Sequence, residues 1–268
     1  MFQNSSLEWK LYVFVVVMLL FFFSFLLAFI ITQRKKLKYQ RDMQELHERQ
    51  QNQLIEAAIR SEETERHRIA EALHDEVGAI LSSSKLHLQG INASLLDERG
   101  KQLHEKGKEL LDEGIQKVRG ISHNLHSNIL KEFGLNEAIR HFVKKTIEGS
   151  IIKATTRLDD SYTTLNAEND ISIYRMVQEL LNNILKHSKA DEILVSSTYQ
   201  NHILEITIFH TGIGLTQQQF EELRYNKDGL GLKNIMNRVI LLRGKIEFFS
   251  EADGYRIRIN VPINTTAT

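Results

Sequence analysis

The chain has no cysteine and only one proline among its 268 residues. Without cysteine it cannot form disulfide bonds, cysteine-ligated zinc sites or iron–sulfur clusters, and it has no thiol nucleophile. Average usage would give about 13 prolines in a chain of this length. Because proline interrupts helices more strongly than any other residue, this shortage predicts long helices.

The chain also lacks an excess of charge of either sign. It carries 34 basic and 34 acidic side chains, so its formal net charge is zero. Proteins that bind nucleic acids usually carry a basic excess, and we therefore expect no direct nucleic-acid binding. The length allows one or two domains with a substantial core.

An uncharged apolar run extends from Leu11 to Ile31. At 1.5 Å of rise per residue, a helix of about 21 residues covers roughly 30 Å, which is the thickness of the hydrocarbon core of a bilayer. The run is too long for the apolar part of a signal peptide, and no small-residue cleavage site follows it. We therefore predict a transmembrane helix over residues 11–32. A buried helix of a soluble protein is the alternative.

Basic side chains are concentrated on the C-terminal side of this run. Lys10 is the only one before it, and those that follow it closely are Arg34, Lys35, Lys36, Lys38 and Arg41. The positive-inside rule places the remainder of the chain in the cytoplasm and leaves residues 1–10 as a short extracytoplasmic tail. Such a tail is too small for a sensor domain, so we expect the input to come through the membrane segment, the tail or another membrane protein.

Residues 33–64 contain no glycine or proline and consist largely of strong helix formers. Apolar residues recur loosely at spacings of three and four, as at Met43 and Leu46 and again at Leu54 and Ala58. This pattern is typical of a helix with one apolar seam. It predicts a helical signalling linker that pairs with a second copy in a parallel dimer. A solvated single helix is the alternative.

Residues 65–132 show helical spacing of apolar residues on both sides of a turn region that contains Gly90 and Gly100. The second helical stretch runs from about residue 101 to residue 130. Two amphipathic helices with a short connection form an antiparallel hairpin, and two hairpins form a four-helix bundle. We therefore predict a dimerisation hairpin over residues 65–132, paired with the same hairpin of a second copy.

The pattern changes after residue 133. Alternation of apolar and polar residues at 193–199, 203–209, 246–249 and 255–261 predicts strands. Helical segments lie between them at 170–187, 217–224 and 230–243. Together they predict an α+β domain over residues 133–263, with helices packed on one face of a sheet, followed by a tail of residues 264–268.

One candidate for chemistry is the pair His74 and Asp75. His74 lies one position beyond Leu73 on the apolar stripe, so its ring is expected to project towards solvent. A neutral imidazole is a competent nucleophile near pH 7, and an adjacent carboxylate can accept its ring proton and fix the tautomer. A surface histidine without a function is the alternative for this pair taken alone.

A second candidate is the helix face shared by Glu179, Asn183 and Lys186, which are spaced by four and three residues. A carboxylate, an amide oxygen and an ammonium group on one face suit a hydrated Mg²⁺ beside phosphates, because Mg²⁺ prefers oxygen ligands and retains waters. An ordinary polar helix face is the alternative.

Two pairs of glycines complete the candidate site. Gly212 and Gly214 follow a strand, and Gly229 and Gly231 open a helix. Glycines at a helix N-terminus let backbone N–H groups approach an anion, and the helix dipole favours negative charge there. Each pair alone could be a plain turn, and the order of the four clusters carries the specificity.

In this order, the four clusters resemble the sensor histidine kinases of bacterial two-component systems, in the subfamily whose phosphoacceptor box reads H-D-x-x-G-Q. The resemblance covers roughly residues 62–262. It implies that His74 accepts a phosphoryl group beside Asp75, that Asn183 is a Mg²⁺ ligand, and that residues 133–263 form a Bergerat-type ATP-binding domain shared with the GHKL ATPases. The residues it implies for nucleotide binding are Glu179, Asn183, Lys186, His187, His210, Gly212, Gly214, Gly229, Leu230, Gly231 and Leu232.

The same resemblance implies the function. The chain would use ATP and Mg²⁺ to phosphorylate His74 and pass the phosphoryl group to an aspartate of a response regulator, as a homodimer that crosses the bacterial inner membrane once. Residues 215–228, between the glycine pairs, would form a short lid over the nucleotide. The alternative is a non-catalytic, membrane-anchored dimeric scaffold with a degenerate nucleotide-binding domain.

Three positions depart from the family pattern. His210 stands where the family has an aspartate that accepts a hydrogen bond from the adenine amino group, so we expect ATP binding that is weaker or more sensitive to pH. Ala79 replaces a glutamine implicated in dephosphorylating the partner, which puts phosphatase activity in doubt. Residues 253–255 lack the usual Gly-Thr before the last strand, and the sequence alone does not explain this departure.

Overall fold

The computed structural model describes residues 4–125, 128–164, 166–225 and 230–263. The chain divides into two compact units, Met1–Leu54 and Ile55–Thr268.

The first unit belongs to helix α1 (Asn4–Ala72). The large apolar side chains from Tyr12 to Ile31 are exposed along it. Among the described residues, α1 and its continuation form the one helix that is long and apolar enough to cross a membrane. The predicted apolar helix is therefore confirmed, whereas its insertion into a membrane stays a prediction.

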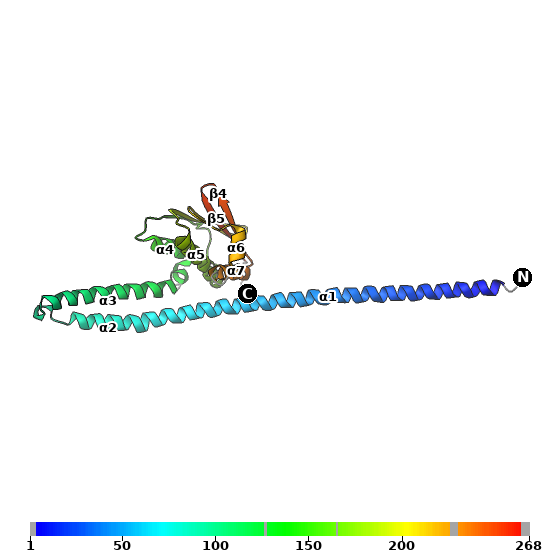
Figure 1. Cartoon of the computed structure of the whole chain (residues 1–268), viewed down its shortest axis with the longest axis horizontal. Helices are drawn as coiled ribbons and strands as arrows, with labels where there is room; N and C mark the ends of the chain where they lie inside the picture. The colour runs from blue at the N-terminus through cyan, green and yellow to red at the C-terminus, as the bar shows by residue number, and fades with distance from the viewer. Residues whose placement is uncertain (1–3, 126–127, 165, 226–229, 264–268) are drawn as a thin grey trace. The chain divides into compact units, whose positions relative to one another are not determined.

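In the second unit, α1 continues through a π-helical turn, η1 (Leu73–Val77), into α2 (Gly78–Gln89). A short 3₁₀ turn, η2 (Ala93–Leu95), then leads to α3 (Glu98–Leu125). The Asp97 carboxylate accepts a hydrogen bond from the backbone N–H of Gly100 at 2.7 Å, which helps to start α3. Helices α2 and α3 lie side by side (Figure 1), so the predicted hairpin is confirmed, whereas the four-helix bundle of two copies stays a prediction.

Helix α4 (Asn128–Ile147) begins within the stretch that we expected to complete the hairpin. Gly134 interrupts it with a φ of 80°, a conformation that costs glycine little. Beyond this kink, Leu135, Ile139 and Phe142 are buried. The sequence analysis did not predict this helix.

The sheet has five strands in the order β1-β2-β3-β5-β4. Strand β1 (Lys153–Arg157) is parallel to β2, and the other pairs are antiparallel. The other strands are β2 (Glu192–Gln200), β3 (Ile203–His210), β4 (Lys245–Glu251) and β5 (Gly254–Pro262). All four predicted strands are confirmed, and β1 was not predicted.

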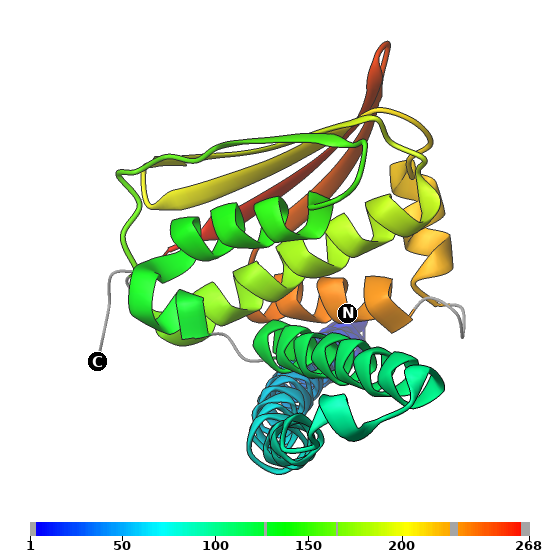
Figure 2. The same ribbon diagram turned by 90° about the vertical axis from the view of Figure 1, so that its left-hand side faces the viewer.

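The predicted helices are confirmed as α5 (Ala167–His187), α6 (Gln217–Leu223) and α7 (Leu230–Leu241). Figure 2 shows α4, α5 and α7 on the same face of the sheet, as the sequence predicts for an α+β domain. Helix α5 starts at a conventional cap, because the Asn166 side chain accepts hydrogen bonds from the backbone N–H groups of Glu168 and Asn169.

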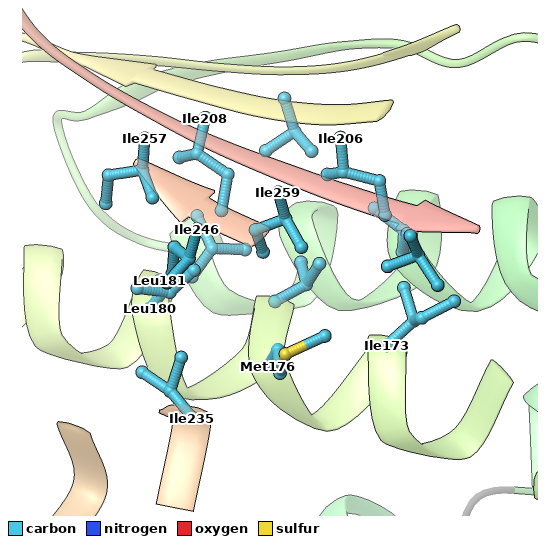
Figure 3. Close-up of a cluster of buried hydrophobic side chains, with 14 of the residues drawn as sticks. Ile173, Met176, Leu180, Leu181, Ile206, Ile208, Ile235, Ile246, Ile257 and Ile259 are labelled. Carbon is cyan, nitrogen blue, oxygen red and sulfur yellow. The ribbon is translucent and has the colours of Figure 1, made fainter. Parts of the chain in front are cut away.

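The core lies between the sheet and α5 (Figure 3). Ile173, Met176 and Leu180 of α5 are buried against sheet residues that include Ile206 and Ile259. Full burial of each such side chain stabilises the fold by about 1.5–3 kcal/mol. This packing fixes α5, and α5 carries most of the polar residues of the candidate site.

Candidate active site

A cavity of about 560 Å³ opens between α5, α7 and the ends of the strands. Of the residues predicted to bind nucleotide, those that line it are Glu179, Asn183, Lys186, His187, His210, Gly214, Gly231 and Leu232. Gly212 and Leu230 do not line it, and Gly229 lies outside the described residues. The structure therefore brings most of the three nucleotide-binding clusters to one site.

The polar face of α5 forms one wall of this cavity. Glu179 and Asn183 are half-buried, whereas Lys186 and His187 are exposed at its mouth. An amide oxygen and a carboxylate one helical turn apart fit part of the coordination shell of Mg²⁺, and nucleotide phosphates and waters usually supply the remainder. Among the described ranges, no three His, Asp or Glu side chains gather into a complete metal cage.

His210 ends β3, is buried and also lines the cavity. Its ring stacks on Tyr255, with centroids 5.8 Å apart and planes 16° apart. Its Nδ1 lies 2.9 Å from the backbone oxygen of Thr211. Because a carbonyl only accepts, Nδ1 must donate, so in the neutral ring Nε2 is the acceptor.

Burial lowers the pKa of His210, and the hydrogen bond to Thr211 opposes this only in part. The ring is therefore neutral at pH 7. A neutral Nε2 can accept a hydrogen bond from an amino group, as the aspartate of the family pattern does. The imidazole thus provides an acceptor where the family has a carboxylate, and it provides that acceptor only while the ring is neutral.

Tyr255, which belongs to the stretch that departs from the family pattern before the last strand, packs against the glycine loop and His210. A Cβ atom on Gly214 would lie 2.2 Å from Cγ of Tyr255, so the glycine loop lies directly on this ring. Tyr255 also pairs with His210 across β3 and β5. The sequence analysis did not identify Tyr255 as a site residue, because its signal was only a missing motif.

The other glycines permit close approaches of a different kind. A Cβ atom on Gly231 would lie 2.1 Å from Oε1 of Glu179, so this glycine lets α7 approach the polar face of α5. Gly212 has a φ of 87°, and a Cβ there would lie 2.2 Å from the backbone oxygen of Ser188. Gly212 therefore lets its loop pack closely against the backbone at Ser188. It does not line the cavity, and its contact with a nucleotide stays a prediction.

The predicted lid is partly helical and is attached to the sheet. Within it, α6 begins at Thr216 in a capping box with Gln219. The Gln217 Oε1 accepts a hydrogen bond from the backbone N–H of Phe248 at 3.0 Å, and Phe220 stacks on Phe248. The end of the predicted lid, residues 226–228, lies outside the described residues.

His74 lies on the π-helical turn η1, and its side chain is 72% exposed. The prediction that its ring projects to solvent is confirmed. Nδ1 of His74 lies 2.8 Å from Oδ1 of Asp75. An ionised carboxylate only accepts, so the ring donates from Nδ1 and leaves Nε2 with a free lone pair. Single π turns inside α-helices are frequent at functional sites.

A buried cluster of charges, which we call the clasp, was not predicted. Its members are Glu62 and Glu63 of α1, Arg175 of α5 and Arg238 of α7. Glu63 pairs with both arginines at 3.0 and 3.2 Å, and the arginine side chains are only 6% and 4% exposed. Burial lowers the pKa of Arg238, while Glu62 and Glu63 oppose this shift. Two adjacent glutamates in a charged helix look like a solvated surface, which is why the sequence did not reveal them.

The clasp joins α1 to α5 and α7, two helices that also line the cavity described above. It lies 11 and 12 positions before His74 in the sequence, which is about 17 Å of helical rise. The cavity and His74 are separate sites in this structure. The described cavity that contains His74 shares no lining residue with the cavity between α5 and α7.

Comparisons with known families agree with this geometry. Residues 65–130, which contain His74, match a family model described as histidine kinase (HisKA_3). Residues 168–265, which contain the cavity, match the family described as histidine kinase-, DNA gyrase B-, and HSP90-like ATPase. The cavity thus belongs to a domain of an ATP-binding family.

Similar curated proteins carry related names. The sensor histidine kinase MctS of Rhizobium johnstonii is 27% identical over 78% of this chain and 45% of its own length. The histidine-protein kinase/phosphatase UhpB of Salmonella typhimurium is 26% identical over 79% of this chain and 41% of its own length. The oxygen sensor histidine kinase NreB of Staphylococcus carnosus is 25% identical over 80% and 60%. The chain spans about half the length of these relatives.

Proposed function

Because the chain belongs to the sensor histidine kinases of two-component signalling, we propose that it phosphorylates its own His74 from ATP and passes the phosphoryl group to an aspartate of a response regulator. The observation that carries this proposal is the exposed His74 ring, which Asp75 holds in the tautomer with a free Nε2. A nucleotide cavity lined by the family's motif residues supports it.

In the proposed reaction, the Nε2 lone pair of His74 forms a bond to the γ-phosphorus. The bond from that phosphorus to the bridging oxygen breaks, and ADP leaves with the electron pair. Asp75 keeps the Nδ1 proton bonded and stabilises the positive charge that develops on the ring. Catalysis of this kind rests mainly on positioning and electrostatics.

On the nucleotide side, His210 would accept a hydrogen bond from the adenine amino group through Nε2. Asn183, with Glu179 beside it, would hold Mg²⁺. When bound, this ion neutralises charge on the phosphates. Lys186 at the mouth of the cavity adds a positive charge near the same groups.

The reaction requires the cavity to reach a His74 ring. The clasp glutamates, Glu62 and Glu63, lie about 17 Å of helical rise from the His74 of the same copy, and the described cavity that contains His74 shares no residue with the nucleotide cavity. We therefore propose one of two routes. Either the ion pairs of the clasp break before transfer, so that the nucleotide-binding domain can move along α1, or the domain phosphorylates the His74 of a second copy. Signals arriving through α1 would act on this step.

We also propose a homodimer that is anchored by residues 11–32 in the bacterial inner membrane. The hairpin exposes apolar side chains that a single copy leaves uncovered, including Val77, Ile80, Leu103 and Leu110. A second hairpin would cover them and complete a four-helix bundle. The basic residues after the apolar run favour a cytoplasmic location for the remainder of the chain.

The test is incubation of the full chain, in lipid vesicles, with γ-labelled ATP and Mg²⁺. We expect label that is labile in acid and stable in alkali on the wild type and none on His74→Ala. His87→Ala removes another exposed histidine, on α2, and should label normally. Absence of label on the wild type, or label that persists on His74→Ala, would contradict the proposal and favour a non-catalytic scaffold.

A further inference from the structure

A second, smaller cavity lies beside His74 and is distinct from the nucleotide cavity. It measures about 300 Å³ and lies between η1, α2 and α3. The residues that line it are His74, Asp75, Gly78, Ala79, Ser82, Ile115, Val118 and Arg119. Gly78 and Ala79 add little or no side chain to it, so space remains next to the imidazole.

Arg119 of α3 is the one basic side chain among these residues, apart from the imidazole itself. It is exposed, and within the described part of the chain no ion pair joins it to a carboxylate. Its neighbours differ in this respect, since Lys117 pairs with Glu113 and Lys85 pairs with Asp112. The hairpin thus leaves one guanidinium group without a counter-ion at the edge of the cavity that contains His74.

A phosphoryl group on Nε2 would bring between one and two negative charges into this region. Asp75 is already bonded to the other ring nitrogen and would repel that charge. A guanidinium group offers a planar fork of donors that matches phosphate oxygens and stays protonated at all relevant pH values. The chemistry of the cavity therefore suits an anionic tetrahedral group held between the imidazole and Arg119.

We propose that Arg119 binds the phosphoryl group carried by His74 and thereby stabilises the phosphorylated state. This inference rests on the proposed function, and it assigns the phosphoryl subsite to a residue of the second hairpin helix. Arg119 forms and breaks no covalent bond. It lowers the free energy of the product of autophosphorylation, so it shifts the equilibrium between ATP with His74 and ADP with phosphohistidine towards the latter.

The experiment measures this equilibrium in the full chain in lipid vesicles, at fixed ratios of ATP to ADP with Mg²⁺. The readout is the ratio of phosphorylated to free His74. We expect Arg119→Gln to lower this ratio about tenfold, the effect of losing one charge-assisted interaction. Arg119→Lys keeps the positive charge but loses the planar fork of donors. Its ratio of phosphorylated to free His74 should lie between those of the wild type and Arg119→Gln.

Arg99→Gln is the matched control, because Arg99 is an exposed arginine near the other end of α3 and does not line the cavity. It should leave the ratio unchanged. A wild-type ratio in Arg119→Gln, or an equal loss in Arg99→Gln, would overturn the inference while leaving the proposed function intact. A wild type in which His74 is not phosphorylated at all would instead contradict the proposed function. Equal binding of ATP by all four proteins would exclude an indirect effect on the nucleotide cavity.

Discussion

The nucleotide-binding domain and the histidine-bearing hairpin differ in how well one copy of the chain covers its apolar residues. In the domain, the sheet and the helices packed on it enclose a core in which Ile206, Ile208 and Ile259 are completely buried. In the hairpin between residues 65 and 125, the buried apolar residues among those described are Ala70 and Ile115. The domain can therefore fold through its own core, whereas the hairpin presents apolar surface for a partner.

This difference separates the two chemical tasks. The cavity needs a fixed arrangement of α5, α7 and the sheet, which a closed core provides. In the proposed reaction, both a nucleotide and an aspartate of another protein must reach His74, and its exposed position on the helix allows this. The same exposure explains why Asp75, and not burial, has to fix the tautomer of the ring.

The largest expected effect is on the core of the domain. Ile206→Ala leaves a cavity between sheet and helices and should lower the free energy of unfolding by about 3 kcal/mol. Ile203→Ala removes the same atoms from a half-exposed position on the same strand and should change it by less than about 1 kcal/mol. Urea unfolding of the full chain in detergent measures both, and the loss should not depend on protein concentration. A small loss for Ile206→Ala would mean that the core is not closed as described.

A smaller effect of another kind is expected in the hairpin. Leu110→Ala removes an exposed apolar side chain that we place at the dimer interface. It should weaken the dimer about tenfold, since burying such a side chain is worth about 1.5 kcal/mol or more. Sedimentation equilibrium measures the dissociation constant. Ile151→Ala, at an exposed position in the domain, is the control. Equal dissociation constants for the two variants would contradict the proposed interface.

The smallest expected effect is the pH dependence of nucleotide binding through His210. Burial holds the pKa of His210 below its unfolded value of 6.5, so the neutral acceptor is fully present above pH 6.5 and is lost as the pH falls through the lowered pKa. Affinity for ADP should therefore be flat from pH 7 to 8 and fall about fivefold in acid, the value of one hydrogen bond. The same shift makes His210 favour the folded state above pH 6.5 and lose that contribution on acidification.

His210→Asn tests this assignment, because an amide oxygen accepts a hydrogen bond without titrating. Titration calorimetry should show that the affinity of the variant for ADP falls less in acid than that of the wild type. A fall of the same size in both proteins would assign the pH dependence to another group.

The sequence predicted elements whose patterns come from burial on one side. Along β2, β3, β4 and β5, buried residues largely alternate with less buried ones, so their periodicity was visible. Strand β1 was missed because it lies at the sheet edge and none of its side chains is buried. Helix α4 was missed although Leu135, Ile139 and Phe142 follow helical spacing, because the sequence analysis placed a domain boundary at residue 133, beside the kink at Gly134 and inside this helix.

The site was predicted to the extent that its residues form local motifs. Glu179 and Asn183 were found through their helical spacing and His210 through the family resemblance, and all three line one cavity. Tyr255 and the clasp depend on contacts between segments that are far apart in the chain, such as Glu63 with Arg175. No local pattern encodes such contacts, so only the structure reveals them.

The most direct test of the central claim is to locate the phosphoryl group by atom. Nitrogen–phosphorus NMR of the autophosphorylated full chain in detergent, labelled with ¹⁵N-histidine, identifies the nitrogen that carries phosphorus. Because Asp75 occupies Nδ1 of His74, we predict a single phosphorus bond at Nε2 of that residue. A bond to Nδ1, or to any other histidine, would contradict the account.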